Sequence, residues 1–306
     1  MKILLATQVP FAAEAVEGIK NIVEQAGHQF ATLEKYADPA ALAAVMGDVD
    51  ALIVRSDKVT SDVLAAAPKL KIVVRAGAGY DNLDLASCTE HGVVAMNTPG
   101  QNANGVAELA IGMMIFLART QFTPATGSEL SGKTIGIQAY GNVGRLVGAK
   151  AAALGMKVRA FDPFMSAEAI AAAGAEPVAD LAELYSSCDY LSIHIPATPQ
   201  TVGSIGYDLV SSMPKGATLI NTARKEVIDE DGLFKALSER EDLKYAADVA
   251  PDNIDRLVKN FGYRVFATPK KMGAHTGEAN VNAGLAAARQ IVDFFATGNT
   301  RFQLNK

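Results

Sequence analysis

Short runs of apolar residues alternate with helix-patterned segments from the start of the chain. Where apolar residues are contiguous the pattern predicts buried strands, at residues 3–6, 51–54, 72–74 and 92–96. Where they recur at helical spacing it predicts helices, at residues 10–26 and 62–67. Strands that alternate with helices indicate a parallel sheet covered on both faces, so we expect a doubly wound α/β domain here.

A second series of the same kind begins at Lys133, after a long apolar helix predicted over residues 102–119. Its strands are predicted at residues 134–138, 157–161, 190–193, 218–221, 245–247 and 265–267. This spacing is typical of a complete second doubly wound sheet.

One long helical pattern, over residues 277–295, closes the chain. The first domain otherwise lacks a late element, so we expect the chain to return there and complete it. The sequence thus predicts an α/β protein of two doubly wound, Rossmann-like domains. One consists of residues 1–98 and 277–306, and the other of residues 99–276 inserted between them.

Composition narrows the class of protein. The chain has 306 residues, of which 49% are hydrophobic and 20% charged, so it is not a disordered chain. A net charge of −5 gives no basic footprint for nucleic acid or an anionic membrane. The first apolar run is too short for a signal peptide, and no run approaches a membrane span. Two cysteines cannot build a disulfide framework, which favours the reducing cytoplasm.

The strand predicted at residues 134–138 leads through a glycine-containing turn into a helix expected over residues 145–154. A dinucleotide-binding turn usually reads G-x-G-x-x-G, and here Ala139 replaces the first glycine, so it must turn with a Cβ present. The second glycine still lets backbone approach a diphosphate, the third allows close helix packing, and the helix start favours an anion. We therefore expect this turn to bind a dinucleotide through Tyr140, Gly141, Asn142, Val143 and Gly144.

Asp162 ends the next predicted strand. A carboxylate at this point of a dinucleotide fold accepts hydrogen bonds from ribose hydroxyls and repels a 2′-phosphate. Together with the turn it predicts NAD rather than NADP as the cofactor. The alternative is an ordinary strand–helix turn followed by an acidic loop.

Six further segments carry motifs: V-R-S at residues 54–56, V-R-A-G-A-G-Y-D-N-L-D at 74–84, N-T-P-G-Q-N at 97–102, V-A-E-L at 106–109, S-I-H-I-P at 192–196 and N-T-A-R at 221–224. In order and in residues they resemble the D-isomer-specific 2-hydroxyacid dehydrogenases, and the second segment most resembles short D-3-phosphoglycerate dehydrogenases. The resemblance implies a cofactor domain inserted into a substrate domain, an active site in the cleft between them, and a homodimer formed through the cofactor domain.

The resemblance also implies roles for individual residues. Arg224 matches the arginine that binds the substrate carboxylate and polarises the C2 oxygen, and a guanidinium suits both tasks because its planar fork pairs with a carboxylate. Residues implied to face the substrate are Arg55, Ser56, Ala76, Gly77 and Asn102. Further residues implied to contact NAD are His194, Pro196, Thr222, Ala223, Asp248, Gly273 and Arg224 itself.

The chain departs from the family at the proton donor, which is usually a histidine in T-P-H-x-G. Here residues 268–273 read T-P-K-K-M-G, and aligning on the glycine places Lys271 at the histidine position. A lysine can accept the proton of an alcohol if nearby cations, here Arg224 and Lys270, lower its pKa. We expect Lys271 to be the acid–base group, with His275 as the alternative because its ordinary pKa suits the task.

The glutamate that orients the histidine in the family is also replaced, by Asn253. A glutamate beside a lysine would hold the amine protonated, so loss of both residues together is chemically coherent. Asp252 could take the place of the glutamate after a small shift.

Several cations follow strands of the first domain, where doubly wound sheets bind ligands. Arg55, Lys58 and Arg75 lie there, and Lys270 and Lys271 belong to the departing motif. Together they favour a substrate with a phosphate tail over lactate or glycerate.

The sequence thus predicts an NAD-dependent oxidoreductase that converts D-3-phosphoglycerate to 3-phosphohydroxypyruvate, the entry to serine biosynthesis. The alternatives are a reductase of hydroxypyruvate, glyoxylate or another 2-oxo acid, and a catalytically weak nucleotide-sensing protein. We expect no metal site. The two domains take up all 306 residues, so we also expect no C-terminal regulatory domain and no serine feedback through one.

Overall fold

The structure is a computed structural model that describes residues 1–305. The chain forms two compact units. Unit 1 comprises residues 1–102 and the segment from Thr276 onward, and unit 2 comprises residues 103–275. These limits lie within a few residues of the division expected from the sequence.

Unit 1 contains five parallel strands in the order β2-β1-β3-β4-β5. Their bounds are β1 Lys2–Thr7, β2 Gln29–Glu34, β3 Ala51–Val54, β4 Ile72–Arg75 and β5 Val94–Asn97. The helices are α1 Ala13–Gln25, α2 Ala40–Ala44, η1 Met46–Asp48, α3 Ser61–Ala65, α4 Leu85–Glu90 and α12 Gly277–Thr297. The strand β2 was not predicted, because this edge strand, Q-F-A-T-L-E, contains no contiguous apolar run.

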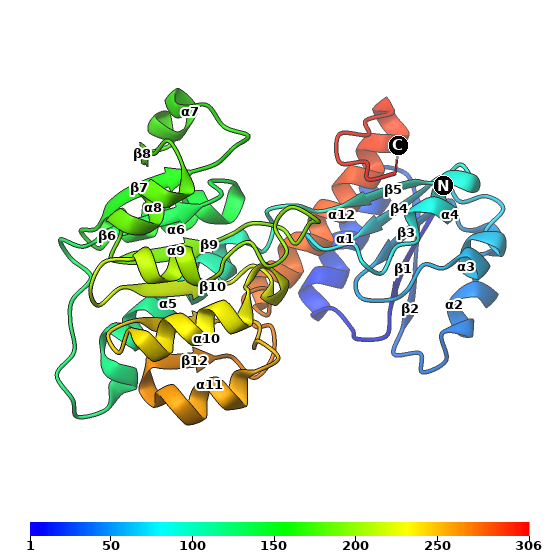
Figure 1. Ribbon diagram of the computed structural model, residues 1–306. Helices are drawn as coiled ribbons and strands as arrows, with labels where there is room; N and C mark the ends of the chain where they lie inside the picture. Colours follow the sequence, from blue (N-terminus) through cyan, green and yellow to red (C-terminus); the bar gives the residue numbers. More distant parts are fainter. Residues whose placement is uncertain (306) are drawn as a thin grey trace. The chain divides into compact units, whose positions relative to one another are not determined.

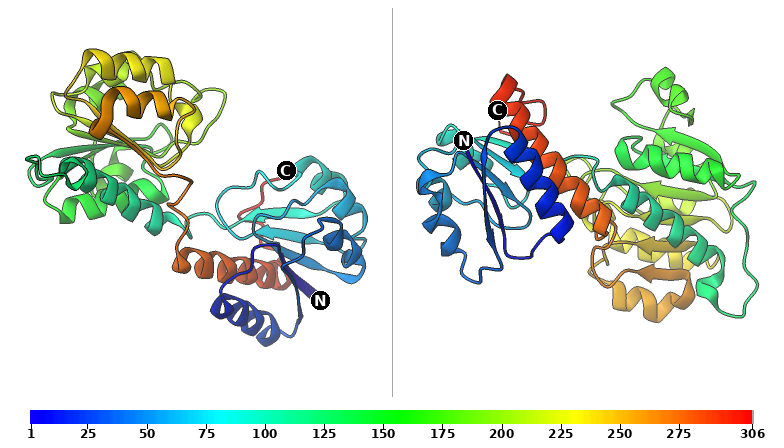
Figure 2. Two further views of the ribbon diagram at one scale, coloured as in Figure 1. Left: turned by 90° about the horizontal axis from the view of Figure 1, so that it is seen from below. Right: turned by 180° about the vertical axis from the view of Figure 1, so that it is seen from behind.

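The two faces of this sheet are covered by different helices. α1 and α12 pack beside each other on one face, where Ile3, Leu5, Ile19 and Ile291 are completely buried (Figures 1 and 2). α2, α3 and α4 cover the other face. The last helix, α12, also contacts β3 and β4 and so packs directly on this sheet.

Unit 2 contains seven parallel strands in the order β12-β11-β10-β9-β6-β7-β8. Their bounds are β6 Thr134–Gln138, β7 Lys157–Phe161, β8 Glu176–Pro177, β9 Tyr190–Ile193, β10 Thr218–Asn221, β11 Lys244–Ala247 and β12 Val265–Ala267. The six predicted strands are confirmed, and β8 is an additional short edge strand. The strand order and parallel pairing confirm the doubly wound class for both units.

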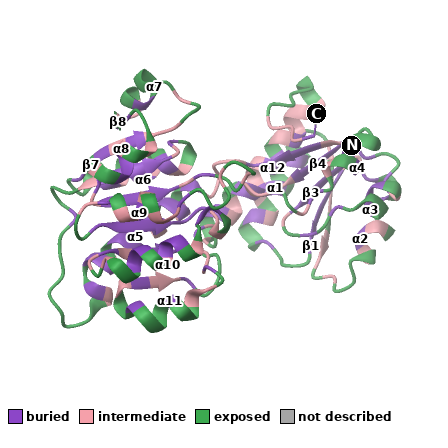
Figure 3. Cartoon of the chain, in the orientation of Figure 1, coloured by how far each residue is buried: buried purple, intermediate pink, exposed green. Residues whose placement is uncertain are grey.

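The helices of unit 2 also divide between the faces of the sheet (Figure 1). One face is covered by α5 Ala103–Ala118, α6 Asn142–Ala153 and α7 Ala167–Ala172. The other is covered by α8 Leu181–Ser187, α9 Tyr207–Ser212, α10 Glu230–Glu239 and α11 Ile254–Phe261. Single-turn helices are η2 Thr120–Phe122, η3 Lys225–Val227 and η4 Gly262–Arg264. The central strands of both units are buried, whereas the edge strands β2 and β8 are partly or fully exposed, and other exposed residues lie on outer helix faces and loops (Figure 3).

Strand register brings the functional loops of each sheet to one edge. In unit 2 the last residues Gln138, Ile193, Asn221 and Ala247 lie opposite one another, so the loops after β6, β9, β10 and β11 emerge together. In unit 1 Ala6, Val54, Arg75 and Asn97 are likewise level. Carboxyl ends of this kind, at a reversal of strand order, are where doubly wound sheets bind ligands.

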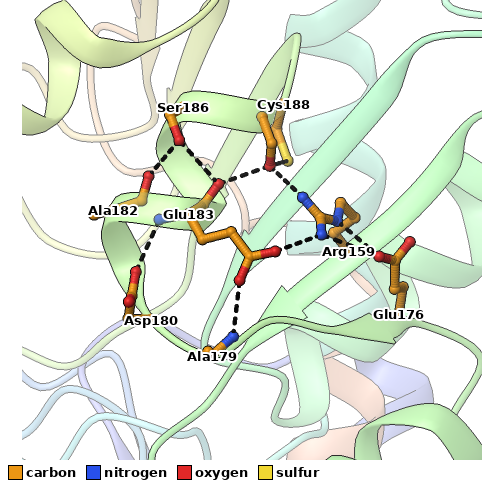
Figure 4. Close-up of polar contacts among 9 residues, drawn as sticks. Arg159, Glu176, Ala179, Asp180, Ala182, Glu183, Ser186 and Cys188 are labelled. Atoms are coloured by element: carbon orange, nitrogen blue, oxygen red, sulfur yellow. Dashed lines mark hydrogen bonds and ion pairs between the residues drawn. The ribbon is translucent and has the colours of Figure 1, made fainter.

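A polar cluster joins β7, β8 and α8 at one edge of the sheet of unit 2 (Figure 4). The guanidinium of Arg159 on β7 donates to Glu183 on α8 at 2.7 Å and to Glu176 on β8 at 3.0 Å, and it also reaches the hydroxyl of Ser187. The Arg159 side chain is 17% exposed, so the cluster is partly shielded from solvent. It ties β8 and α8 to β7, the strand whose end carries Asp162.

Residues 1–305 contain neither a membrane-spanning helix nor a cluster of metal ligands. Within residues 1–305 no helix is long and apolar enough to cross a membrane. In the same residues no group of three or more His, Cys, Asp or Glu side chains could hold a metal ion.

Candidate functional site

The turn after β6 has the conformation that the sequence predicted. Ala139 has a φ of 73°, a left-handed conformation that costs an L-residue about 1–2 kcal/mol. A Cβ on Gly144 would stand 2.3 Å from the Ala139 carbonyl oxygen, so only glycine lets α6 start this close to the turn. A Cβ on Gly141 would meet nothing within 4 Å. One glycine therefore serves packing, and the other leaves open space in front of the helix.

The start of α6 offers a place for an anion. Gly141 is the N-cap of this 12-residue helix, and Gly141 and Asn142 are exposed. The amides of the first turn have no helical acceptor, and the helix dipole adds positive character there. Open space before unpaired amides fits a diphosphate, as expected from the turn sequence.

Asp162 is fixed beside this turn by backbone amides. One carboxylate oxygen accepts from the N–H of Tyr140 and the other from the N–H of Phe164, each at 2.9 Å. Each oxygen keeps lone-pair capacity for a further donor, such as a ribose hydroxyl. The Tyr140 side chain is 1% exposed and its hydroxyl donates to Ala173, so only the Tyr140 backbone belongs to the turn.

The loops after β9 and β10 carry His194 and Arg224. The Nε2 of His194 lies 2.9 Å from the Ser192 hydroxyl, and its Nδ1 lies 3.4 Å from that of Thr222. Burial lowers the pKa of His194 to about 3, so this imidazole is neutral near pH 7 and suits a positioning role. Pro196 follows on the same loop and is exposed.

Arg224 is placed by a residue that the sequence analysis missed. The side-chain oxygen of Asn221 accepts from the Ala223 amide at 3.0 Å, while its nitrogen donates to the Arg224 carbonyl at 2.8 Å. This small ring fixes the turn from Thr222 to Arg224. The Arg224 side chain is half-buried and donates to the Ala223 carbonyl at 2.9 Å.

Asp248 holds the loop that contains the lysine pair. Its carboxylate is completely buried and accepts from the amides of Met272 at 2.7 Å and Gly273 at 2.8 Å, and from the Thr268 hydroxyl at 3.1 Å. A Cβ on Gly273 would lie 2.9 Å from this carboxylate. The resemblance implied an NAD contact for Asp248. In the structure both of its carboxylate oxygens accept hydrogen bonds from the loop that contains Lys271. The T-P-K-K-M-G motif gave no signal of this.

The two acid–base candidates are four residues apart in sequence: Lys271 lies on this loop, and His275 follows it. Lys270, Lys271 and His275 are all exposed, and the His275 amide donates to the Met272 carbonyl at 2.7 Å. Asn253 is the N-cap of α11, and its side-chain oxygen is buried with no partner within residues 1–305.

Asp252, the possible replacement for the missing glutamate, forms an ion pair with Lys225. That hydrogen bond raises the pKa of Lys225. The Asp252 side chain is 79% exposed, so its carboxylate lies at the surface of unit 2.

Unit 1 gathers the predicted anion-binding residues at its own carboxyl edge. The Arg55 guanidinium lies over the Phe11 ring at 5.8 Å, and Arg75 donates from Nε to the Arg55 carbonyl at 2.9 Å. Burial lowers the pKa of both arginines, and Arg55 lowers that of Arg75 further. Two cations held together in a partly buried place favour an anionic ligand.

The remaining predicted residues of unit 1 differ in exposure. Ser56 and Lys58 are exposed, Ala76 is buried and Asn102 is partly buried. Gly77 has a φ of 148° and a Cβ there would overlap the Arg75 guanidinium, so a glycine is needed beside this arginine. Its amide donates to the Thr98 hydroxyl at 2.7 Å.

The sequence and the structure of the chain are both similar to those of known dehydrogenases. Residues 112–271 match the family model described as D-isomer specific 2-hydroxyacid dehydrogenase, NAD binding domain. The chain is 38% identical over 267 residues to D-3-phosphoglycerate dehydrogenase of Rattus norvegicus, covering 82% of this chain and 50% of the rat protein. It thus spans about half the length of that relative.

Two shorter proteins are covered more completely. Hydroxypyruvate reductase of Thermotoga maritima is 36% identical, with 81% of this chain and 85% of that protein covered. The crystal structure of NAD+-bound 3-phosphoglycerate dehydrogenase of Entamoeba histolytica is 48% identical. Its TM-score is 0.86, with 100% of this chain and 99% of that chain covered.

Proposed function

Because the chain belongs to the D-isomer-specific 2-hydroxyacid dehydrogenase family, we propose that it is an NAD-dependent D-3-phosphoglycerate dehydrogenase. It oxidises D-3-phosphoglycerate to 3-phosphohydroxypyruvate, the first step of serine biosynthesis. The observation that carries this proposal is the 48% identity, over the whole chain, to a 3-phosphoglycerate dehydrogenase that binds NAD+. With two unpaired, buried cysteines, we place the enzyme in the cytoplasm.

Unit 2 holds the cofactor in this proposal. The first-turn amides of α6 bind the diphosphate, and Gly141 leaves room for it to approach. The Asp162 carboxylate accepts hydrogen bonds from the adenosine ribose hydroxyls, and its negative charge repels a 2′-phosphate. Bound NAD supplies a ring carbon that accepts a hydride.

Arg224 and Lys271 carry the chemistry of the substrate. The Arg224 guanidinium pairs with the carboxylate and polarises the oxygen on C2. As the C2–H bond breaks and its hydride leaves, the hydroxyl proton passes to the Lys271 amine, and the C–O single bond becomes a carbonyl.

The acid–base assignment is tested by Lys271→Ala and His275→Ala. We expect NAD reduction to fall at least a hundredfold in the first variant and less than threefold in the second, since general acid–base groups contribute about 10²–10⁴-fold. The reverse order would assign the role to His275. Full activity in Lys271→Ala would end the lysine proposal.

The phosphate of the substrate is bound by cations of unit 1 in this proposal. Arg55 and Arg75 are partly buried and held by neighbouring groups, and Lys58, three residues after Arg55, is exposed. Initial rates with D-3-phosphoglycerate, D-lactate, D-glycerate and D-2-hydroxyglutarate test this step. D-3-Phosphoglycerate should have the highest kcat/KM, and a better substrate among the other three would refute the assignment.

A reductase of hydroxypyruvate is the second candidate, because the Thermotoga maritima protein of that name is 36% identical and 85% covered. Rates of NADH oxidation with hydroxypyruvate and with 3-phosphohydroxypyruvate distinguish the two. NAD binding with no turnover of any 2-hydroxy acid would instead favour a nucleotide-sensing protein.

A homodimer formed through unit 2 completes the proposal. An apolar cavity of about 390 Å³ lies on this unit, lined by Leu109, Gly112, Met113, Ile115, Phe116, Phe122 and Phe266. Phe122 is 68% and Ile115 37% exposed, and exposed apolar patches of this kind mark association surfaces. Sedimentation should give a dimer for the chain and a monomer for Ile115→Asp; a monomeric chain would refute the proposal.

A further inference from the structure

A buried carboxylate joins four loops at the carboxyl edge of unit 1. Asp57 follows β3 and is 3% exposed. Its Oδ1 accepts from the Gln8 amide at 2.7 Å and from the Tyr36 hydroxyl at 2.6 Å. Its backbone carbonyl accepts from the Asn82 side chain at 2.7 Å. Asp57 therefore connects its own loop to those that follow β1, β2 and β4.

The same segment is also held at its other end. The Arg55 carbonyl accepts from Arg75, and the Arg55 guanidinium rests over the Phe11 ring. Ser56, between the two held residues, is exposed. The segment of residues 55–57 is thus held at both ends, and between these ends Ser56 is exposed next to Arg55.

Burial of the Asp57 carboxylate destabilises the fold, because one of its oxygens has no hydrogen-bond partner within residues 1–305. Its Oδ2 is buried and has no hydrogen-bond partner within residues 1–305. An unsatisfied buried polar atom destabilises a fold, more so when the group is charged. Such groups occur at functional sites, where their charge or geometry is needed.

The charges around Asp57 agree with this. Burial lowers the pKa of Arg55 and the Asp57 charge opposes that shift, so Asp57 favours the charged guanidinium. Burial raises the pKa of Tyr36, and its bond to Asp57 raises it further, so this hydroxyl stays a donor.

We propose that Asp57, held by Tyr36 and the Gln8 amide, is a positioning residue that sets Arg55 and Ser56 to receive the anionic end of the substrate. The inference rests on the proposed function, in which unit 1 binds the substrate. It assigns to Asp57 and Tyr36 an effect on substrate binding without contact with the substrate.

Steady-state kinetics of Tyr36→Phe and Asp57→Asn test the proposal. We expect the KM for D-3-phosphoglycerate to rise about fivefold in the first variant and at least tenfold in the second. The KM for NAD should stay within twofold, since the cofactor belongs to unit 2. The double variant should be no worse than Asp57→Asn, because the Tyr36 hydroxyl acts on the substrate site only by placing the Asp57 charge, which Asp57→Asn already removes.

Tyr207→Phe is the matched control. The Tyr207 hydroxyl donates to the exposed Glu239 at 2.6 Å in unit 2, so its loss should leave both KM values unchanged. Equal rises in the two KM values, additive effects in the double variant, or an unchanged substrate KM in both single variants would overturn the proposal. If Asp57→Asn does not fold, Tyr36→Phe alone decides.

The failure of this inference is distinct from that of the proposed function. If the unaltered chain turns over no 2-hydroxy acid, the proposed function fails. Calorimetric binding of D-3-phosphoglycerate to the unaltered chain and to Tyr36→Phe then decides the positioning role. Weaker binding in the variant supports it, and equal binding or no binding to either refutes it.

Discussion

Two glycines of the same turn should respond differently to alanine. At Gly144 the new Cβ would stand 2.3 Å from the Ala139 carbonyl oxygen and 3.0 Å from a methyl of Ile137. Backbone must move to relieve the first contact. At Gly141 the new Cβ would meet no protein atom within 4 Å, and it would instead occupy the space before the α6 amides.

The magnitudes follow from these contacts. Overpacking of this severity destabilises a protein by about 1–3 kcal/mol, so Gly144→Ala should lower the Tm by roughly 3–10 °C. Because the turn shifts, its affinity for NAD should fall at least tenfold. Gly141→Ala should leave the stability within about 0.5 kcal/mol of the original, yet also weaken NAD binding at least tenfold.

Scanning calorimetry and titration calorimetry with NAD on the same preparations measure both effects. Gly47→Ala is the control, because a Cβ there meets nothing within 4 Å and the residue lies in unit 1. An unaltered Tm for Gly144→Ala would refute the packing argument. Unaltered NAD affinity for Gly141→Ala would refute the placement of the diphosphate.

Three further predictions concern single side chains. Asp162→Ser should raise kcat/KM with NADP at least tenfold and lower that with NAD, as measured by initial rates, because the charge that repels a 2′-phosphate is removed. Asp248→Ala should accelerate amide hydrogen exchange at Met272 and Gly273 at least tenfold, since both N–H groups lose their acceptor. The pKa of His194 is about 3 in the fold, against an ordinary value of 6.5. Between these values the unfolded chain binds the proton and the fold does not, so stability present above pH 6.5 is lost as pH falls. Urea unfolding measures the free energy of unfolding at pH 7 and at pH 4.5. The decrease between these two pH values should be about 2 kcal/mol smaller in His194→Gln than in the unaltered chain.

The sequence predicted the fold most accurately where strands are buried on both faces. Five of the six strands predicted in unit 2, such as Tyr190–Ile193, have the predicted bounds, and β11 begins one residue earlier than predicted, at Lys244. The edge strand Gln29–Glu34 was missed, because none of its residues is fully buried and it has no contiguous apolar run. Pattern alone does not separate such a strand from a loop.

For the site, the sequence predicted positions but not the contacts that hold them. The left-handed Ala139 could be foreseen, because the G-x-G-x-x-G pattern requires a turn at that place. The roles of Asn221, Asp57 and Asp248 could not, because each depends on amides or hydroxyls brought near by tertiary structure. Hydrogen bonds between distant loops leave no periodic signal in a single sequence.

The central claim is that this chain removes a hydride from C2 of D-3-phosphoglycerate and delivers it to NAD. Mass spectrometry of the nucleotide formed from D-3-phosphoglycerate deuterated at C2 tests it most directly. We expect NADH carrying one deuterium, in amounts equal to the 3-phosphohydroxypyruvate produced. Formation of unlabelled NADH would contradict this reaction. So would a chain that forms no NADH from D-3-phosphoglycerate but does oxidise D-lactate or D-glycerate.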